Sequence, residues 1–304
     1  MAWTTFEQFS IQELAQTRRQ RPSGPEMVRS GMMTRYLTGL LRNRQKGSPF
    51  VSGYPASSIV IPAYNESARI EATLREVVNC IRSEGWNAEV IVVNDGSTDT
   101  TARQVLDFAL NAPEVRLLEN PGNRGKGYSV RNGLLQAQGE IVMFTDADLS
   151  APIREADRLF AAIRDGADIA IGSRWVDRSR QIHRQPLYRQ FFGRCFNLIT
   201  RTVMGLRFHD TQCGFKAFTR QAAQTVFQLQ TIQGWGFDPE ILFIASKRHL
   251  RVDEVPVTWG HDERTRISYL RDGFHMLREM AVIRWNALLG RYNGPVRPIA
   301  RPMA

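Results

Sequence analysis

The sequence predicts an α/β protein with a doubly wound, mostly parallel sheet, followed by a C-terminal amphipathic helix. Short apolar runs of strand length alternate with segments whose apolar residues recur at helical spacing. Such alternation places the strands parallel, because each helix crosses over between two of them. The chain has 304 residues, of which 42% are hydrophobic and 23% charged, a composition typical of a globular protein with a sizeable core.

The first strand and helix are expected between residues 57 and 85. The run Ser58–Ile61 is apolar apart from its first residue and is ended by Pro62, as in a buried strand. A helix follows, with Ser67 as its expected N-cap and Gly85 as its stop. Its core-facing residues are expected to be Ile70, Leu74, Val77, Val78 and Ile81.

The same pattern repeats to about residue 171 and then weakens. Further strands are expected at 90–93, 115–118, 141–144 and 169–171, with helices through Val105, Val130 and Leu159 between them. Beyond about residue 175, the sequence indicates a helical segment, a glycine-containing loop at 212–214 and a helix from Asp238.

Both ends of the chain differ from the sheet region. We expect a basic N-terminal extension at 1–56, the sheet domain at 57–268, and an amphipathic helix and tail at 269–304. The apolar stripe of that helix comprises Leu270, Phe274, Leu277, Ala281, Trp285 and Leu288. A basic helix with Trp and Phe can dock on an anionic membrane, whereas the same stripe can also form a core or homo-oligomer contact.

A net charge of +10 and a pI near 10.1 predict a surface that attracts anions. Nucleic acid is not the expected partner, because no nucleic-acid-binding motif accompanies the charge. The three cysteines show neither metal-type spacing nor a disulfide framework, which favours a reducing cytosol. No apolar stretch of about 18 residues and no secretory signal are visible, so the expected location is cytoplasmic, peripheral on the inner face of the membrane.

Polar residues follow the first, second and fourth expected strands, in the clusters Ala63–Glu66, Asn94–Ser97 and Asp146–Asp148. Ligands of a doubly wound sheet bind outside the carboxyl ends of its strands, so these clusters are expected to converge on one site. Asp146 and Asp148 are suitable ligands for Mg²⁺ or Mn²⁺, which would bridge to phosphate oxygens of a substrate. The alternative is that these acids cap the next helix.

The loop Gly122–Gly127 is rich in glycine and carries Lys126. Its backbone N–H groups and the ammonium group are candidates for binding phosphate. The loop matches neither the phosphate loop of NTPases nor the glycine fingerprint of dinucleotide-binding enzymes. A glycine-rich turn without a ligand is the alternative.

Four segments resemble, in this order, the motifs of the family-two glycosyltransferases, which are inverting enzymes of the GT-A (Rossmann-like) fold. They are Ile61–Glu66, Val93–Asp99, Asn123–Gly127 and Asp146–Asp148. Further segments look like the dolichyl-phosphate glucosyltransferase branch, namely Gly172–Arg174, Asp210–Lys216 and Gly236–Glu240. The resemblance runs from about Ser57 to Ser268 and omits both ends.

This resemblance implies roles for individual residues. The nucleotide pocket would be formed by Pro62, Tyr64, Glu66, Val93 and Asp95, with Asp146 and Ala147 near the ribose and diphosphate. Asp148 would be the principal metal ligand, and Ser150 stands where the mannosyl branch has a Gln or similar group. The basic residues near the donor diphosphate and the acceptor phosphate would be Arg174, Arg189 and Arg266. A guanidinium grips phosphate oxygens bidentately, although solvated surface charge is the usual state of an arginine.

The implied function is transfer of a hexose, glucose from UDP-glucose, to a polyprenyl phosphate of the dolichyl type. A phosphate acceptor is already anionic near neutral pH, whereas a hydroxyl acceptor needs a general base, for which Asp238 and Glu240 are candidates. Both acids can instead cap the helix that follows Pro239. The alternatives are a GDP-mannose-dependent polyprenyl-phosphate mannosyltransferase, transfer to a non-lipid hydroxyl, and a nucleotidyltransferase.

Overall fold

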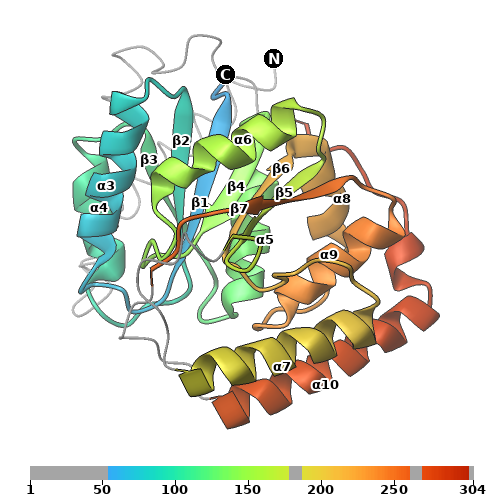
Figure 1. Ribbon diagram of the computed structural model, residues 1–304. Coiled ribbons are helices and arrows are strands. Elements are labelled where there is room, and N and C mark those ends of the chain that lie inside the picture. Colours follow the sequence, from blue (N-terminus) through green and yellow to red (C-terminus); the bar gives the residue numbers. More distant parts are fainter. Residues whose placement is uncertain (1–53, 178–186, 261–268, 301–304) are drawn as a thin grey trace, which may run out of the picture. The chain divides into compact units, whose positions relative to one another are not determined.

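The computed structural model describes residues 54–177, 187–260 and 269–300, with the backbone alone at 187–192, 194–196, 269–272 and 274. Within these residues, seven strands form one sheet in the order β3-β2-β1-β4-β6-β5-β7 (Figure 1). The strands are β1 (Ser57–Ala63), β2 (Ala88–Asn94), β3 (Val115–Glu119), β4 (Ile141–Thr145), β5 (Ile169–Ser173), β6 (Phe215–Thr219) and β7 (Val252–Pro256).

Helices connect and cover these strands. They are α3 (Ile70–Ser83), α4 (Thr101–Ala109), α5 (Lys126–Gln136), α6 (Ala156–Arg164), α7 (Leu187–Met204), α8 (Arg220–Leu229), α9 (Phe237–Lys247) and α10 (Tyr269–Leu288). Two short 3₁₀ helices are η1 (Ile153–Glu155) and η3 (Arg291–Asn293). The expected strands and helices up to β5 are all present, so the prediction of a doubly wound α/β sheet is confirmed for this region.

The sheet is mostly parallel, as predicted, with one strand reversed. β1 lies between β2 and β4 and is parallel to both, whereas β6 is antiparallel to β4 and to β5. β5 is parallel to β7 at the sheet edge. β6 and β7 were not predicted from the sequence. Each has only five residues, and charged residues interrupt them, at Lys216 in β6 and at Asp253 and Glu254 in β7.

Close backbone approach sets the packing on the sheet. β2 is buried along its whole length, and Val60 and Val93 belong to the core cluster beneath α5. A Cβ at Gly133 of α5 would lie 2.4 Å from Val60 Cγ1, so only glycine lets α5 approach β1 this closely. α8 packs beside α5, while α4 and α6 contact other parts of the sheet. This packing fixes the strand ends that carry the candidate site.

One local prediction was wrong. α3 begins at Ile70 with Arg69 as its N-cap, and the backbone N–H of Ser67 instead donates to Asp99 Oδ2 at 3.1 Å. The helix α10 is present at the expected position, and its amphipathic character stays a prediction. Leu277 and Trp285 of the expected stripe are 42% and 63% exposed, and Arg278 is exposed as well.

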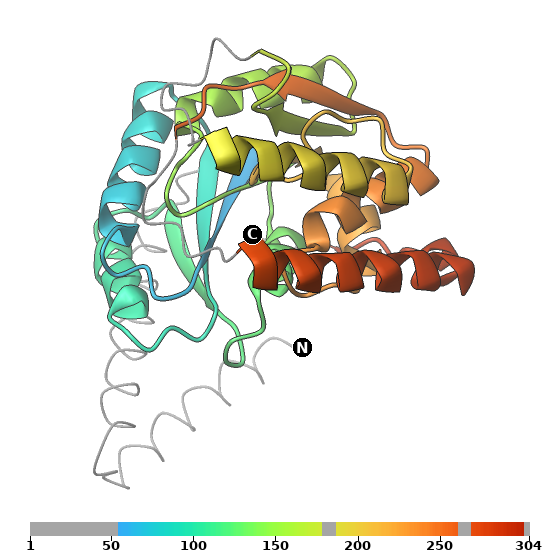
Figure 2. The ribbon, with the colours of Figure 1, turned by 60° about the horizontal axis from the view of Figure 1, so that its bottom comes forward.

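α7 and α10 contact each other and lie below the sheet in the view of Figure 1, and Figure 2 brings this side of the protein forward. α10 packs inward through Met280, Ile283 and Asn286, all buried. Among the described side chains of these two helices, the exposed large apolar residues are Leu198, Ile199, Val203, Leu277, Val282, Trp285 and Leu288. In the described part of the chain, none of the helices has the length and apolarity that a membrane span requires.

Candidate active site at the carboxyl edge of the sheet

The loops after β1 and β2 are tied together by hydrogen bonds. The N–H of Asn65 donates to Ser97 Oγ at 2.9 Å, and Asn65 Oδ1 accepts the N–H of Thr98 at 2.8 Å. The N–H of Glu66 donates to Thr101 Oγ1 at 2.8 Å. The structure therefore brings together the first two polar clusters predicted from the sequence.

Asp95 organises the glycine-rich loop that precedes α5. It is 4% exposed, and its carboxylate accepts the N–H groups of Arg124 and Gly125 at 2.9 and 2.8 Å. Asn120 Nδ2 donates to the same carboxylate at 2.8 Å. A Cβ at Gly96, whose φ is +70°, would lie 2.6 Å from the backbone of Gly122, so the two loops touch. Two of the N–H groups expected to cradle phosphate are thus already bound to Asp95.

Lys126 connects this loop to the acidic triplet after β4. Its Nζ lies 2.5 Å from Asp146 Oδ1. Burial disfavours the ammonium charge, but Asp146 and Asp238 outweigh burial and raise the pKa of Lys126. A Cβ at Gly214 would lie 2.1 Å from Asp146 Oδ2, so glycine is required where the turn before β6 meets the triplet. This turn lies in a segment singled out from the sequence.

The rest of the triplet is held from two sides. Thr73 Oγ1 of α3 donates to the carbonyl oxygen of Ala147 at 2.6 Å, and Asp148 Oδ1 accepts the N–H of Ser150 at 3.0 Å. Burial and the neighbouring Asp146 raise the pKa of the Asp148 carboxyl. A cation bound beside Asp146 and Asp148 would favour the charged form of the Asp148 carboxyl.

The residues fit a divalent cation that substrate oxygens complete. In the described residues, no group of three or more His, Cys, Asp or Glu side chains is placed to enclose a metal. Mg²⁺ is commonly held by one or two carboxylates together with substrate phosphates, and Asp146 and Asp148 supply that number. The side chain of Ser150 is not needed for such a site.

A second lysine–aspartate pair lies beneath the first. Lys216 of β6 is fully buried, and its Nζ donates to the Asp238 carboxylate and to the carbonyl oxygen of Cys213, the latter at 2.6 Å. Burial raises the pKa of Asp238, and Lys216 and Lys126 only partly offset this. Asp238 was predicted from the sequence as a candidate site residue, whereas the role of Lys216 was not predicted. The available signal was a single lysine inside the apolar run Phe215–Phe218.

The carboxylate of Glu240 is engaged in hydrogen bonds, which argues against its use as a base. Its carboxylate accepts hydrogen bonds from the N–H and hydroxyl of Thr231, the N–H of Ile232 and the hydroxyl of Tyr292, at 3.0, 2.6, 2.8 and 2.7 Å. The capping alternative is wrong for both acids, because the N-cap of α9 is Gly236 and no side chain caps it. Asp238 remains a predicted base.

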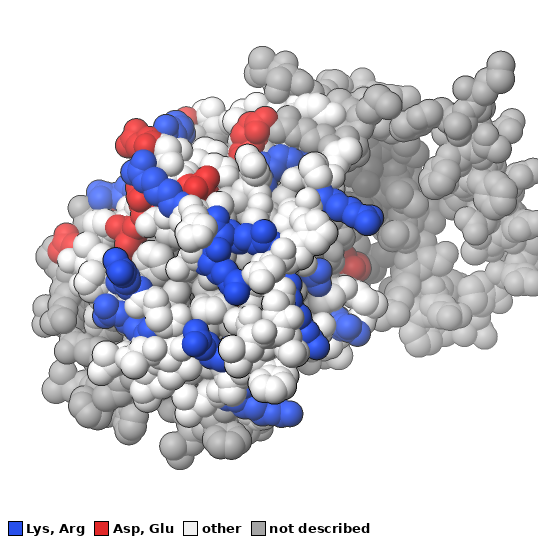
Figure 3. All heavy atoms as spheres, turned by 90° about the vertical axis from the view of Figure 1, so that its right-hand side faces the viewer, with Lys and Arg blue, Asp and Glu red and all other residues white. Residues whose placement is uncertain are grey.

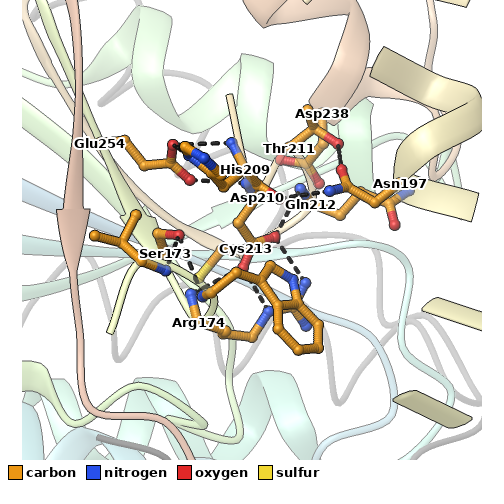
Figure 4. Close-up of polar contacts among 12 residues, drawn as sticks. Ser173, Arg174, Asn197, His209, Asp210, Thr211, Gln212, Cys213, Asp238 and Glu254 are labelled. Carbon is orange, nitrogen blue, oxygen red and sulfur yellow. Dashed lines mark hydrogen bonds and ion pairs between the residues drawn. The ribbon is translucent and has the colours of Figure 1, made fainter. Parts of the chain in front are cut away.

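Arg174, immediately after β5, is paired with Asp210 (Figure 4). Nε and one terminal nitrogen of the guanidinium lie 2.7 and 2.8 Å from the two carboxylate oxygens. Burial opposes both charges, but each group holds the other ionised, so the pKa of Arg174 is raised and that of Asp210 is lowered. Glu254 of β7 holds the segment before β6 in place, because its carboxylate accepts the backbone N–H of Asp210 at 2.7 Å. The phosphate contact of Arg174 stays a prediction.

The remaining predicted residues divide into three groups. Pro62 and Glu66 are partly exposed at the strand ends, and Tyr64 is 42% exposed there. The side chain of Val93 is fully buried in the core under α5, so its expected place in the nucleotide pocket is wrong for the side chain. The side chain of Arg189 and the whole of Arg266 lie outside the described residues.

The fold has a counterpart among solved structures. It is similar to glucosyl-3-phosphoglycerate synthase of Mycobacterium tuberculosis, a GT-A structure solved with Mn²⁺, uridine-diphosphate-glucose and phosphoglyceric acid. The TM-score is 0.57 at 21% identity, over 79% of this chain and 81% of that chain. Residues 58–227 match the sequence model of glycosyl transferase family 2, so the chain belongs to this family and is a glycosyltransferase.

The chain is also similar to curated dolichyl-phosphate beta-glucosyltransferases. It is 40% identical to one from Trichomonas vaginalis over 238 residues, which are 72% of this chain and 70% of the relative. It is 32% identical to that of Saccharomyces cerevisiae over 254 residues and 30% identical to that of Homo sapiens over 250 residues. Both of these alignments cover 77% of this chain and 76% of the relative.

Proposed function

We propose that the protein transfers glucose, with inversion, from UDP-glucose to a polyprenyl phosphate. The observation that carries the proposal is the charged cluster at the carboxyl edge of the sheet, where Lys126 pairs with Asp146 next to Asp148. The choice of sugar and acceptor is supported by the relatives at 30% to 40% identity, which are named as dolichyl-phosphate beta-glucosyltransferases.

The donor diphosphate would bind at the acidic triplet. Asp146 and Asp148 would hold Mg²⁺ or Mn²⁺, which supplies positive charge to the leaving diphosphate. Solved structures of similar fold were crystallised with Mn²⁺ or Mg²⁺ and uridine-diphosphate, which supports this use of a divalent cation. Lys126 adds a second positive charge 2.5 Å from Asp146. The nucleotide would extend from there towards Tyr64 and Asp95.

The acceptor needs positive charge more than a base. A phosphate monoester is anionic near neutral pH and attacks the anomeric carbon without losing a proton to the enzyme. Arg174, Arg189 and Arg266 are the proposed phosphate-binding residues. The Asp238→Asn variant tests the alternative, since near-normal turnover removes any general-base role from Asp238.

A lipid acceptor requires access to a membrane, and we propose that the protein docks peripherally on its cytoplasmic face. Leu277, Trp285 and Leu288 of α10 and Leu198 of α7 are exposed apolar residues that suit this contact. On the face that Figure 3 shows, Lys and Arg side chains are widely spread, whereas Asp and Glu gather mainly along one edge. Basic residues strengthen docking on acidic lipids. Failure to co-sediment with anionic liposomes at low salt contradicts this proposal.

Single-donor reactions test the catalytic proposal. The purified protein is incubated with a short polyprenyl phosphate, Mn²⁺ or Mg²⁺, and either UDP-glucose or GDP-mannose, and products are identified by mass analysis. We expect a polyprenyl phosphohexose from UDP-glucose, loss of product with a metal chelator, and recovery when metal is restored. Product only from GDP-mannose identifies a mannosyltransferase, and pyrophosphate release identifies a nucleotidyltransferase.

A further inference from the structure

Trp235 lies on a turn that the rest of the structure holds rigidly. On one side, the N–H of Gly236 donates to Glu279 Oε2 of α10 at 2.7 Å. A Cβ at Gly234 would lie 2.5 Å from Glu279 Oε1, and a Cβ at Gly236 would lie 2.5 Å from Oε2. A side chain at either glycine would displace Glu279 from this position.

The same turn is pinned from the side of α5. The N–H of Tyr128 donates to the carbonyl oxygen of Gln233 at 3.1 Å, and a Cβ at Gly125 would lie 2.6 Å from that oxygen. A Cβ at Gly127 would lie 2.9 Å from the carbonyl oxygen of Gly234. The turn is therefore held from two sides, and the Trp235 side chain is left 47% exposed.

The exposed ring stands beside the proposed diphosphate position. Lys126 Nζ lies 5.1 Å from the centroid of the Trp235 ring, and the same nitrogen lies 2.5 Å from Asp146. In a nucleotide sugar, the hexose follows directly after the diphosphate. A pyranose presents a face of C–H groups with partial positive charge, and an indole ring presents a face with partial negative charge, so the two surfaces are complementary.

We propose that Trp235 binds the hexose of the nucleotide-sugar donor by stacking against its C–H face, and that Glu279 is the positioning residue that holds the tryptophan in place. The inference rests on the proposed donor and adds the residue that recognises its sugar. Nucleotide and diphosphate contacts lie elsewhere, on the strand ends and the triplet. Trp235 should therefore affect the affinity for the sugar nucleotide and leave the affinity for the free nucleotide unchanged.

Equilibrium binding with Mn²⁺ and without acceptor tests this separation. In Trp235→Ala, we expect the Kd of UDP-glucose to rise about 3- to 10-fold, the scale of one aromatic contact, while the Kd of UDP changes less than about twofold. Trp235→Phe should retain part of the affinity. Leu110→Ala is the matched control, since Leu110 is 48% exposed at the end of α4, and it should leave both constants unchanged.

Glu279→Ala should raise the Kd of UDP-glucose, as Trp235→Ala does. Glu279→Gln should keep the Kd near that of the wild type, because the amide retains an acceptor oxygen for the N–H of Gly236. The double variant Glu279→Ala/Trp235→Ala should be no weaker than Trp235→Ala alone, since the first residue acts through the second. Additive losses overturn the positioning role.

Other outcomes also decide the inference. Equal weakening of UDP and UDP-glucose overturns it, because the ring would then contact the nucleotide. Unchanged donor binding with a raised KM for the polyprenyl phosphate overturns it in favour of an acceptor contact. If the wild-type protein binds UDP but not UDP-glucose, the proposed donor is wrong, and the effect of Trp235→Ala on GDP-mannose relative to GDP then decides the stacking contact independently.

Discussion

Two lysine–aspartate pairs at the same edge of the sheet differ in their access to solvent. In the outer pair, the side chains of Lys126 and Asp146 are 15% and 35% exposed. In the inner pair, those of Lys216 and Asp238 are 0% and 6% exposed. The charge composition is the same, but only the outer pair is placed to exchange its partner for a metal ion or a diphosphate.

The difference indicates two uses of one ion pair. A buried pair loses the hydration of both charges, so its members remain bound to each other and fix the backbone around them. Lys216 does this by joining α9, through Asp238, to the turn at Cys213. A partly exposed pair contributes less to stability, and its charges stay available. We therefore expect the inner pair to govern folding and the outer pair to govern donor binding.

The largest expected effect is on stability, in Lys216→Met. Removing the buried ammonium leaves Asp238 as an uncompensated buried charge, which should lower the free energy of unfolding by about 3–5 kcal/mol. Urea denaturation at neutral pH measures the change. The double variant Lys216→Met/Asp238→Asn removes both charges and should recover a substantial part of the loss. Equal losses in the single and double variants contradict the role of the pair.

Lys126→Met should separate activity from stability. We expect kcat to fall by about 100- to 1,000-fold, the usual cost of one group that stabilises developing negative charge. The free energy of unfolding should change by less than about 1 kcal/mol, because the pair is partly exposed. Steady-state kinetics and urea denaturation of the same preparation give both numbers. A variant that loses stability and keeps turnover reverses the assignment of the two pairs.

Much of this arrangement follows from the sequence, and the rest has an identifiable cause. The strands and the acidic residues at their ends were predictable because β1, β2 and β4 are buried, parallel and read as apolar runs ended by polar residues. Lys216 was missed because a fully buried lysine breaks the rule that charged residues lie outside, and only its contact with Asp238, 22 residues later, explains it. The partners of Arg174 and Glu240 were missed for the same reason, since contacts distant in sequence leave no local pattern.

A third ion pair, between Arg174 and Asp210, should make the stability of the folded protein depend on pH. Asp210 is fully buried against Arg174, and its pKa is lowered in the folded protein. Its stabilising contribution is therefore present above the ordinary aspartate pKa near 4 and is lost as pH falls through the lowered folded value. Asp210→Asn should be less stable than the wild type at pH 7, and this gap should narrow as pH falls from about 4 towards 2. A gap that does not change with pH means that the carboxylate charge contributes nothing.

The smallest expected effect concerns how the outer pair keeps its geometry. Asp146 is partly open, so its ion pair alone cannot hold the triplet, and the fixed point is the hydrogen bond from Thr73 Oγ1 to the carbonyl oxygen of Ala147. Thr73→Val keeps the shape and removes the donor, which should cost about 1 kcal/mol of stability. Thr73 Oγ1 donates as well to the carbonyl oxygen of Arg69, four residues before it, at 3.2 Å. The control is Thr225→Val, because Thr225 Oγ1 makes the same bond to Gln221 within its own helix but lies away from the triplet. If backbone contacts position the triplet, Thr73→Val raises the KM for UDP-glucose several-fold and Thr225→Val does not; equal kinetics in the two variants would mean that the charges of Lys126 and Asp146 suffice.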